Sequence, residues 1–358
     1  METFRLLKEL TETAAPSGNE TAVADLITDL WQPHVDSLSR DRLGNLVALK
    51  SGQGPEPRPR LLLAAHMDEI ALMVKNIVRQ GESGFLEITS VGGVDRRHLY
   101  GQTVVVHGKR PLPGVVGGLP DKMLPEGKRG KVHSFEALTV DVGLPFKEVA
   151  ELVSVGDFIS FRQPLQKLRG QRVAGKALDN RASVAAVTVC LDYLNGRTHQ
   201  WDLLAVATVQ EEVGLRGAFT SAYAQRPDLA IAIDVTFGKG PGATDHNAFD
   251  LGGGPVIDLG PNVHPGIYQA LKETAKALEM TVHTGTHTRS SGTDAHALQI
   301  ARAGIPTGVV SIPLRYMHTM VESLDMADVE RVGRLLGEFT ARLDDKFLDQ
   351  LTEGLMAT

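Results

Sequence analysis

The chain of 358 residues is poor in the features that mark several classes of protein. A single cysteine, Cys190, excludes an internal disulfide, and its place in an apolar helical stretch favours a buried small side chain. Aromatic residues make up only 5% of the sequence, and no apolar run approaches the roughly 20 residues that span a bilayer. The formal net charge of −6 gives no reason to expect nucleic acid or an anionic membrane as a partner.

The first ten residues lack the apolar centre of a secretory signal peptide. They carry four charged side chains, Glu2, Arg5, Lys8 and Glu9. We therefore expect a cytoplasmic protein.

What the chain does contain is a change of pattern along its length. Residues 1–71 and 166–358 alternate helix-like and strand-like segments, whereas residues 72–165 hold short strands separated by Gly and Pro turns. The simplest arrangement is one α/β domain, in two parts, interrupted by an inserted small β-rich domain.

Side chains with metal-binding atoms follow the apolar runs of the α/β segments. The run 61–65 precedes His66 and Asp68, the run 203–209 precedes Glu211 and Glu212, and the run 229–233 precedes Asp234. In open α/β sheets, ligands bind off the carboxyl ends of the strands, so these side chains are expected to meet at one edge. Asp179 and His318 complete a set of imidazoles and carboxylates that suits two divalent ions in a hydrolytic site.

Each of these residues also has an ordinary structural interpretation when it is taken singly. Asp179 can cap a helix, Asp234 can cap a turn, His318 can lie on the surface, and Glu211 with Glu212 can form a solvated loop. Independent structural uses would not be expected to supply a complete two-metal ligand set at strand ends. The set as a whole therefore favours a metal site.

The motifs around these residues resemble, in order and spacing, those of the M42 family of metallo-aminopeptidases. They are AHMDEI (65–70), KALDNR (176–181), VATVQEEVG (206–214), IDV (233–235), GTDA (292–295) and RYMHT (315–319). The likeness runs from APSG (15–18) to beyond His318. Two departures, Asn180 where relatives often have Asp and Ala71 where they often have Gly, touch no proposed ligand.

The resemblance implies a binuclear aminopeptidase that removes N-terminal residues from peptides with a free N-terminus. Two divalent ions, zinc or cobalt with manganese possible, would share Asp179. His66 and Asp234 would complete the coordination of one ion, and Glu212 and His318 would complete that of the other. Glu211 would be the general base, and Asp68 would support His66. A cis peptide bond between Asp179 and Asn180 is implied as well.

The resemblance also extends to the fold and the assembly. It implies a mixed-sheet, zinc-peptidase-like catalytic domain with helices on both faces. The inserted domain at 72–165 would be barrel-like and would mediate dimerisation, with dimers assembling into a dodecamer.

Two other activities and one other role stay open from the residues alone. A related metal deacylase or carboxypeptidase would need an arginine clamp for the substrate carboxylate, and a glycosidase would need exposed aromatic side chains. A catalytically silent scaffold is disfavoured because no proposed ligand or base is missing. Residues 283–294 are expected to form a loop near the site, where Arg289 either favours an acidic substrate side chain or is an ordinary surface arginine.

Overall fold

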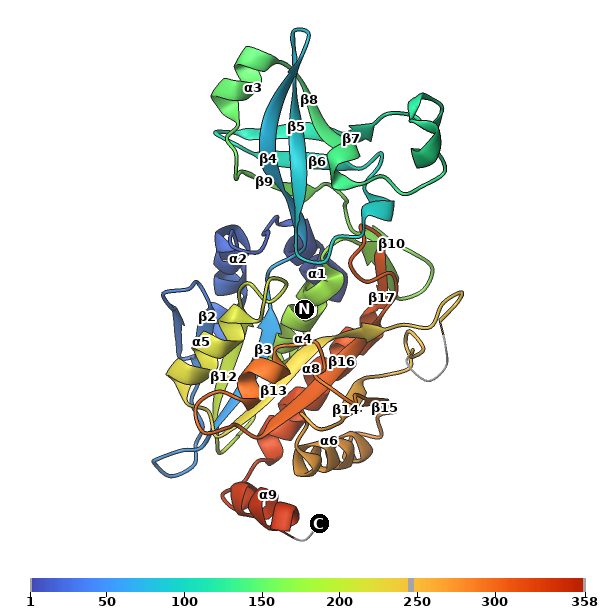
Figure 1. Ribbon diagram of the computed structural model, residues 1–358. Helices are drawn as coiled ribbons and strands as arrows, with labels where there is room; N and C mark the ends of the chain where they lie inside the picture. Colours follow the sequence, from blue (N-terminus) through green and yellow to red (C-terminus); the bar gives the residue numbers. More distant parts are fainter. Residues whose placement is uncertain (1, 244–247, 357–358) are drawn as a thin grey trace.

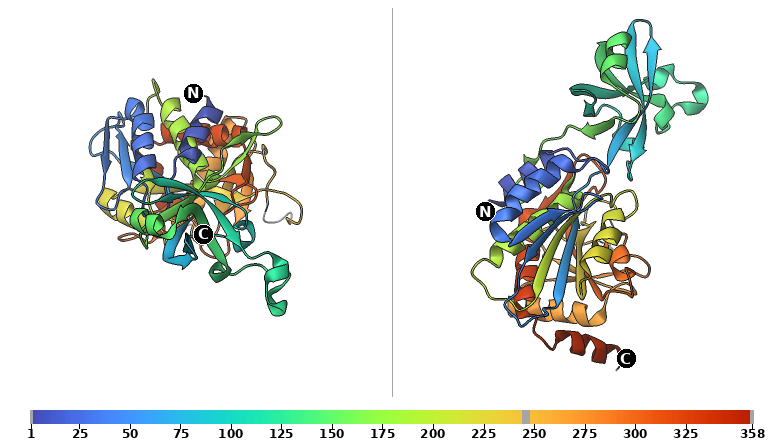
Figure 2. Two further views of the ribbon diagram at one scale, coloured as in Figure 1. Left: turned by 90° about the horizontal axis from the view of Figure 1, so that it is seen from above. Right: turned by 90° about the vertical axis from the view of Figure 1, so that its left-hand side faces the viewer.

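The computed structural model describes residues 2–243 and 248–356. A larger α/β part and a smaller barrel lie end to end, with the barrel standing off one end of the sheet (Figures 1 and 2). The chain enters the barrel through β4 and returns through β9, so the α/β part is built from segments on both sides of this insertion.

The central sheet has eight strands in the order β1-β2-β12-β3-β13-β16-β14-β15. Their bounds are β1 Ser37–Arg40, β2 Leu46–Lys50, β12 Asp202–Thr208, β3 Arg60–His66, β13 Leu229–Phe237, β16 Thr307–Leu314, β14 Val256–Leu259 and β15 His283–Thr286. The four central strands, β12, β3, β13 and β16, run parallel, while β2 and β14 pair antiparallel with their inner neighbours. The predicted mixed sheet is confirmed.

Helices cover both faces of this sheet, which explains why its central strands are apolar throughout. In β3, Leu61 and Leu63 pack into one buried cluster, and Leu62 and Ala64 pack into another on the opposite face. The first face is covered by α1 (Thr3–Glu12), α2 (Thr21–Trp31), α4 (Leu178–Tyr193) and α8 (Met326–Arg342), the second by α5 (Arg216–Gln225) and α7 (Ala295–Gln299). Helix α6 (Pro265–Ala277) packs on β14 and β16, and α9 (Phe347–Met356) packs on α6.

The inserted part is a closed antiparallel barrel with its own apolar core. Its strands follow the order β4-β5-β8-β7-β6-β9, with bounds β4 Ala71–Gln80, β5 Ser83–Val91, β8 Leu138–Pro145, β7 Pro111–Gly118, β6 Thr103–His107 and β9 Phe158–Phe161. Helix α3 (Phe146–Leu152) packs against it, and short 3-10 helices lie at Arg96–His98, Asp121–Met123, Glu126–Lys128 and Phe135–Ala137. This confirms the predicted barrel-like insertion; the domain limits at 71/72 and 165/166 stay a prediction.

A third, small sheet joins segments near the barrel. It contains β10 (Gln166–Lys167), β11 (Arg172–Gly175) and β17 (Glu322–Asp325), and one more 3-10 helix spans Gln32–His34. Cys190 is buried in α4, where burial raises the pKa of its thiol to about 12. Within the described ranges, no helix combines the length and the apolar character needed to cross a membrane.

The expectation of a loop over residues 283–294 was wrong at its start. His283–Thr286 form β15, which pairs parallel with β14 at the edge of the sheet. Gly285 disfavours a strand locally, but hydrogen bonding to β14 satisfies the backbone as a strand.

Candidate metal centre

Predicted side chains from three strands meet at the carboxyl edge of the central sheet. Strand β3 ends at His66, β13 carries Asp234, and β12 ends at Thr208 just before Glu211 and Glu212. Because β12, β3 and β13 are adjacent and parallel, their carboxyl ends lie at one edge. The sheet therefore brings these residues together, as the sequence predicted.

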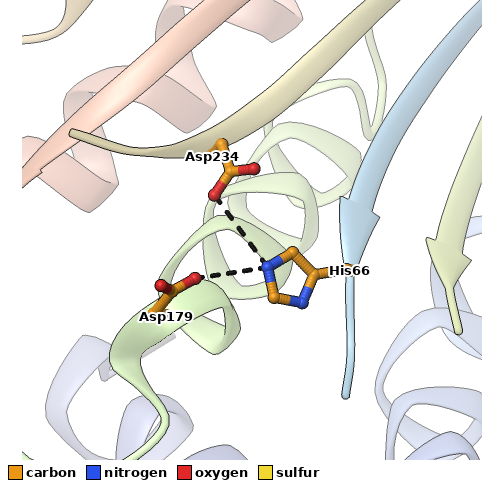
Figure 3. A group of neighbouring side chains, drawn as sticks. All are labelled: His66, Asp179 and Asp234. Carbon is orange, nitrogen blue, oxygen red and sulfur yellow. Dashed lines mark hydrogen bonds and ion pairs between the residues drawn. The ribbon is translucent and has the colours of Figure 1, made fainter. Parts of the chain in front are cut away.

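Asp179 stands between two groups of side chains. In the first group, His66 Nε2 lies 3.2 Å from Asp179 Oδ1 and 4.0 Å from Asp234 Oδ1 (Figure 3). In the second, His318 Nε2 lies 3.4 Å from Asp179 Oδ2 and 3.6 Å from Glu212 Oε1. Within each group the ligand atoms lie within 4.8 Å of one another. One carboxylate thus faces both groups, each of which can hold a metal ion.

Asp68 positions both His66 and the two glutamates. Its Oδ1 lies 3.3 Å from His66 Nδ1, which leaves Nε2 facing the carboxylates. The same carboxylate accepts hydrogen bonds from the backbone amides of Glu211 and Glu212, at 3.1 and 3.2 Å. Ser17 Oγ donates to its other oxygen at 2.5 Å. Asp68 therefore links the end of β3 to the turn that follows β12.

The segments that carry the site residues contain left-handed backbone at positions that are not glycine. Ala177, Gln210 and His318 have φ values of 55°, 55° and 60°. Such conformations are uncommon for residues with a side chain and are found most often at functional sites. The turn at Gln210 is what allows Glu211 and Glu212, adjacent in sequence, to face one site. The peptide bond between Asp179 and Asn180 is cis, as the resemblance implied.

Burial and mutual repulsion disfavour the ionised forms of the carboxylates at this site. Burial, reinforced by the charges of Asp234, Asp294 and Glu212, raises the pKa of Glu211 to about 10. Burial and Asp179 likewise raise the pKa of Glu212 to about 7. Buried carboxylates that cannot all ionise alone are stabilised by cations among them. The donor set of imidazole and carboxylate therefore fits divalent ions.

The pKa values of both imidazoles among the proposed ligands are raised by the neighbouring carboxylates. The hydrogen bond to Asp179 raises the pKa of His318 to about 9. Burial disfavours the charged form of His66, but Glu211, Asp179 and Asp68 together raise its pKa well above the usual value. Protons thus occupy the positions where cations would bind, and the two compete.

Two buried acids of the site were not recognised in the sequence. Glu322 on β17 accepts a hydrogen bond on each of its oxygens. The donors are the backbone amides of Asp179, at 3.0 Å, and His318, at 2.9 Å. Asp294, inside the quoted GTDA motif, accepts a hydrogen bond from Thr208 Oγ1 at 2.5 Å. Glu322 has no distinctive motif of its own. Its nearest signal is a single acid in an apolar segment four residues after a candidate ligand.

A cavity of about 930 Å³ opens onto the metal-binding groups. His66, Asp179, Glu211, Glu212 and His318 line one part of it. Its other walls come from β14, β15, β16 and the segment 286–293. This volume lies in the range of small-molecule and peptide sites. A substrate can therefore reach both groups from one side.

The α/β fold, with two overlapping groups of buried or half-buried metal-binding side chains facing one cavity, defines a metal-dependent hydrolase. The chain belongs to the M42 glutamyl aminopeptidase family, whose model matches residues 44–335. It is accordingly a metallo-aminopeptidase, and the predicted family and activity are confirmed.

Individual relatives match nearly the whole chain. The lysyl aminopeptidase of Pyrococcus furiosus is 36% identical over 340 residues, which cover 94% of this chain and 96% of that protein. Aminopeptidase APDkam598 from the archaeon Desulfurococcus kamchatkensis is 35% identical with a TM-score of 0.88, covering 98% and 97%. The TET1 peptidase of Pyrococcus horikoshii is described as assembling into a tetrahedron or a large octahedral shell. It is 30% identical with a TM-score of 0.82, covering 96% and 100%.

The family match and the similarity to a lysyl aminopeptidase assign the chain to the aminopeptidases, rather than to the deacylase, carboxypeptidase or glycosidase considered from the sequence. The positions of the tryptophans agree with this result. Trp31 and Trp201 are both buried in the core, so neither offers a flat face to a sugar.

Proposed function

We propose that this aminopeptidase uses two divalent cations that share Asp179. His66 and Asp234 would complete the coordination of one cation, and Glu212 and His318 that of the other. The observation that carries this proposal is the pair of three-residue groups, each with its ligand atoms within 4.8 Å, that have Asp179 in common. A carboxylate shared in this way keeps two cations close enough to act on one water molecule.

Glu211 is the residue that we assign as general base. It belongs to neither group, yet its Oε2 lies 3.9 Å from His66 Nε2 at the wall of the same cavity. Two bound cations would lower the pKa of water and polarise the scissile carbonyl. Glu211 then accepts a proton from the attacking water as the new C–O bond forms. It returns that proton to the leaving nitrogen as the C–N bond breaks.

Asp68 and Glu322 would act as positioning residues. Asp68 holds the imidazole of His66 and the backbone of both glutamates, and Glu322 holds the backbone of Asp179 and His318. Such outer partners keep ligands in place and tune their basicity. Between them they connect to four of the five proposed ligands.

Zinc or cobalt are the cations that we propose, with manganese also compatible. Imidazole nitrogens suit zinc and cobalt, and the three carboxylates extend the range to manganese. The substrates are proposed to be peptides with a free N-terminus. The family is described as glutamyl aminopeptidase and one relative as lysyl aminopeptidase, so membership does not decide which N-terminal residue is preferred.

Metal stoichiometry tests this proposal directly. Protein loaded with cobalt or zinc is expected to hold two ions per chain after excess metal is removed. Asp234→Asn should hold close to one, because it removes a charged ligand from the first group only. Asp29→Asn, an exposed position on α2, serves as the matched control and should hold two. Elemental analysis against protein concentration gives the count. One ion in the unmodified protein, or two in Asp234→Asn, would contradict the assignment.

We also propose that the barrel is a dimerisation domain and that dimers assemble into a dodecamer. Large apolar side chains are exposed in residues 100–132 of the inserted part, a stretch that includes Tyr100, Val115, Leu119, Met123 and Val132. Exposed apolar surface is often used for protein–protein contacts. The assembly described for the Pyrococcus horikoshii relative supports the proposal.

The mass of the assembly in solution tests this part of the proposal. Sedimentation analysis is expected to show twelve chains. Leu119→Glu with Met123→Glu should yield smaller species, since two buried unpaired charges oppose an apolar contact. Val155→Glu, another exposed apolar position of the insertion, is the control. A monomer in the unmodified protein, or an unchanged mass in the double variant, would contradict a contact through this stretch.

A further inference from the structure

A carboxylate away from the metal-binding groups is buried in the wall of the substrate cavity. Asp258, near the end of β14, is only 1% exposed, yet it lines the same cavity as His66 and Glu211. Aspartate is almost never buried to this extent unless it is paired or used. Neither the metal groups nor the general base accounts for this residue.

The two oxygens of Asp258 have partners of unequal strength. Ser311 Oγ donates to Oδ2 at 2.7 Å. Among the described residues, no donor makes a hydrogen bond of good geometry to Oδ1, and His287 Nε2 lies 3.3 Å away as its ion-pair partner. A buried carboxylate in the wall of a cavity is a strong site for an incoming cation.

The neighbouring strand is shaped to leave room for this carboxylate. Gly285 on β15 is the register partner of Asp258, and a Cβ at this position would lie 1.9 Å from Asp258 Oδ1. Any side chain at residue 285 would therefore displace the carboxylate. Glycine at this one position leaves the space that Oδ1 occupies.

The position of Asp258 relative to the metal groups suits the side chain of the residue being released. Ser311 on β16 is in register with Asp234 on β13, and β14 lies on the other side of β16. Asp258 is thus two strand spacings, each roughly 4.8 Å, from the strand that carries a proposed ligand. The four-carbon stem of a lysine side chain bridges a gap of this kind and carries its charge at the far end.

We propose that Asp258 selects substrates whose N-terminal residue has a cationic side chain, lysine or arginine. This inference rests on the proposed function, because it places the scissile bond at the two metal groups. The ammonium or guanidinium of the substrate takes the place of His287 at Oδ1. Asp258 raises the pKa of His287, so this imidazole is the group that the substrate's cation displaces from the carboxylate.

Arg289 is the competing determinant, because it lines the same cavity and would favour an acidic side chain. Its side chain is exposed, whereas that of Asp258 is buried. Water and salt screen an exposed charge far more than a buried one. The buried carboxylate therefore has the larger influence on which side chain the cavity accepts.

Matched chromogenic substrates test this inference. Lysyl and norleucyl 4-nitroanilides differ only at the charged end of the side chain, and the glutamyl compound tests the opposite charge. We expect the metal-loaded enzyme to show a higher kcat/KM for the lysyl than for the norleucyl compound. Asp258→Asn, which keeps the shape and the acceptor for Ser311, should reduce this ratio by about 30-fold or more. Asp345→Asn is the control for the lost charge, since it is exposed near the C-terminus and outside the cavity.

A second variant separates a change in substrate preference from misfolding of Asp258→Asn. Gly285→Ala keeps Asp258 but forces its carboxylate to move, and it should lower the lysyl-to-norleucyl ratio in the same direction. A ratio near one in the unmodified enzyme, an unchanged ratio in both variants, or a preference for the glutamyl compound would each overturn the assignment of Asp258. Failure to cleave all three substrates with excess cobalt would instead overturn the proposed function, and this inference with it.

Discussion

Glu211→Gln is expected to lower kcat by roughly 10²- to 10⁴-fold while both cations stay bound. Glutamine keeps the size of the side chain but cannot accept the proton of the attacking water. Glu211 lies outside both three-residue groups, and its backbone amide is held by Asp68 whichever side chain is present. Neither the metal groups nor the turn after β12 should therefore change.

Glu212→Gln is the matched control, because it is the same substitution at the next residue. Glu212 belongs to the group with Asp179 and His318, so this variant should bind one cation more weakly. Part of its activity should return as the metal concentration is raised. Metal stoichiometry and turnover of both variants, followed across one metal titration, separate the two roles. Loss of a cation from Glu211→Gln, or its rescue by excess metal, would reverse the assignment.

Removal of metal by a chelator is expected to abolish hydrolysis, and added cobalt or zinc should restore it. Without cations, the positive charge among the proposed site residues is limited to the imidazoles of His66 and His318, whose pKa values are raised. None of these polarises a scissile carbonyl as a divalent ion does. Turnover of an aminoacyl 4-nitroanilide before chelation, after it and after readdition measures the effect.

The same experiment should change the stability of the protein. A ligand that binds the folded state and not the unfolded state stabilises it, so the metal-stripped protein should melt at a lower temperature. A thermal melt with and without cobalt provides this second measurement. Full activity in verified metal-free protein would exclude the two-cation mechanism.

Much of the site could be predicted because its ligands follow apolar strands. The run that ends at His66 and the run that precedes Asp234 are buried on both faces, so their apolar character identifies them as central strands. Parallel strands end at a common edge, which predicts that the polar residues after them meet. The same logic placed Glu211 and Glu212, with a turn that the structure locates at Gln210.

Asp258 and Glu322 escaped prediction because nothing in their local sequence distinguishes them. Each lies in a short strand, where a single acid most often faces water. Their importance comes from burial and from partners that are distant in the chain. Ser311 is 53 residues from Asp258, and Asp179 is 143 residues from Glu322. The strand β15 was missed for a related reason, since its pairing with β14 overrides the low strand propensity of Gly285.

The sequence by itself determined the class of protein, the α/β part with its insertion, and the residue types available for metal and proton chemistry. These follow from local periodicity and from motif spacing, which the chain carries wherever it is placed. The tertiary structure alone decided which oxygen of Asp179 faces which histidine and which carboxylates are buried away from water. It also decided that Asp258 lines the same cavity as the metal-binding groups. His66 and Asp179 are 113 residues apart, yet their atoms lie at 3.2 Å. A distance of this kind depends on how strands and helices pack, because burial and electrostatic coupling arise only when distant segments meet.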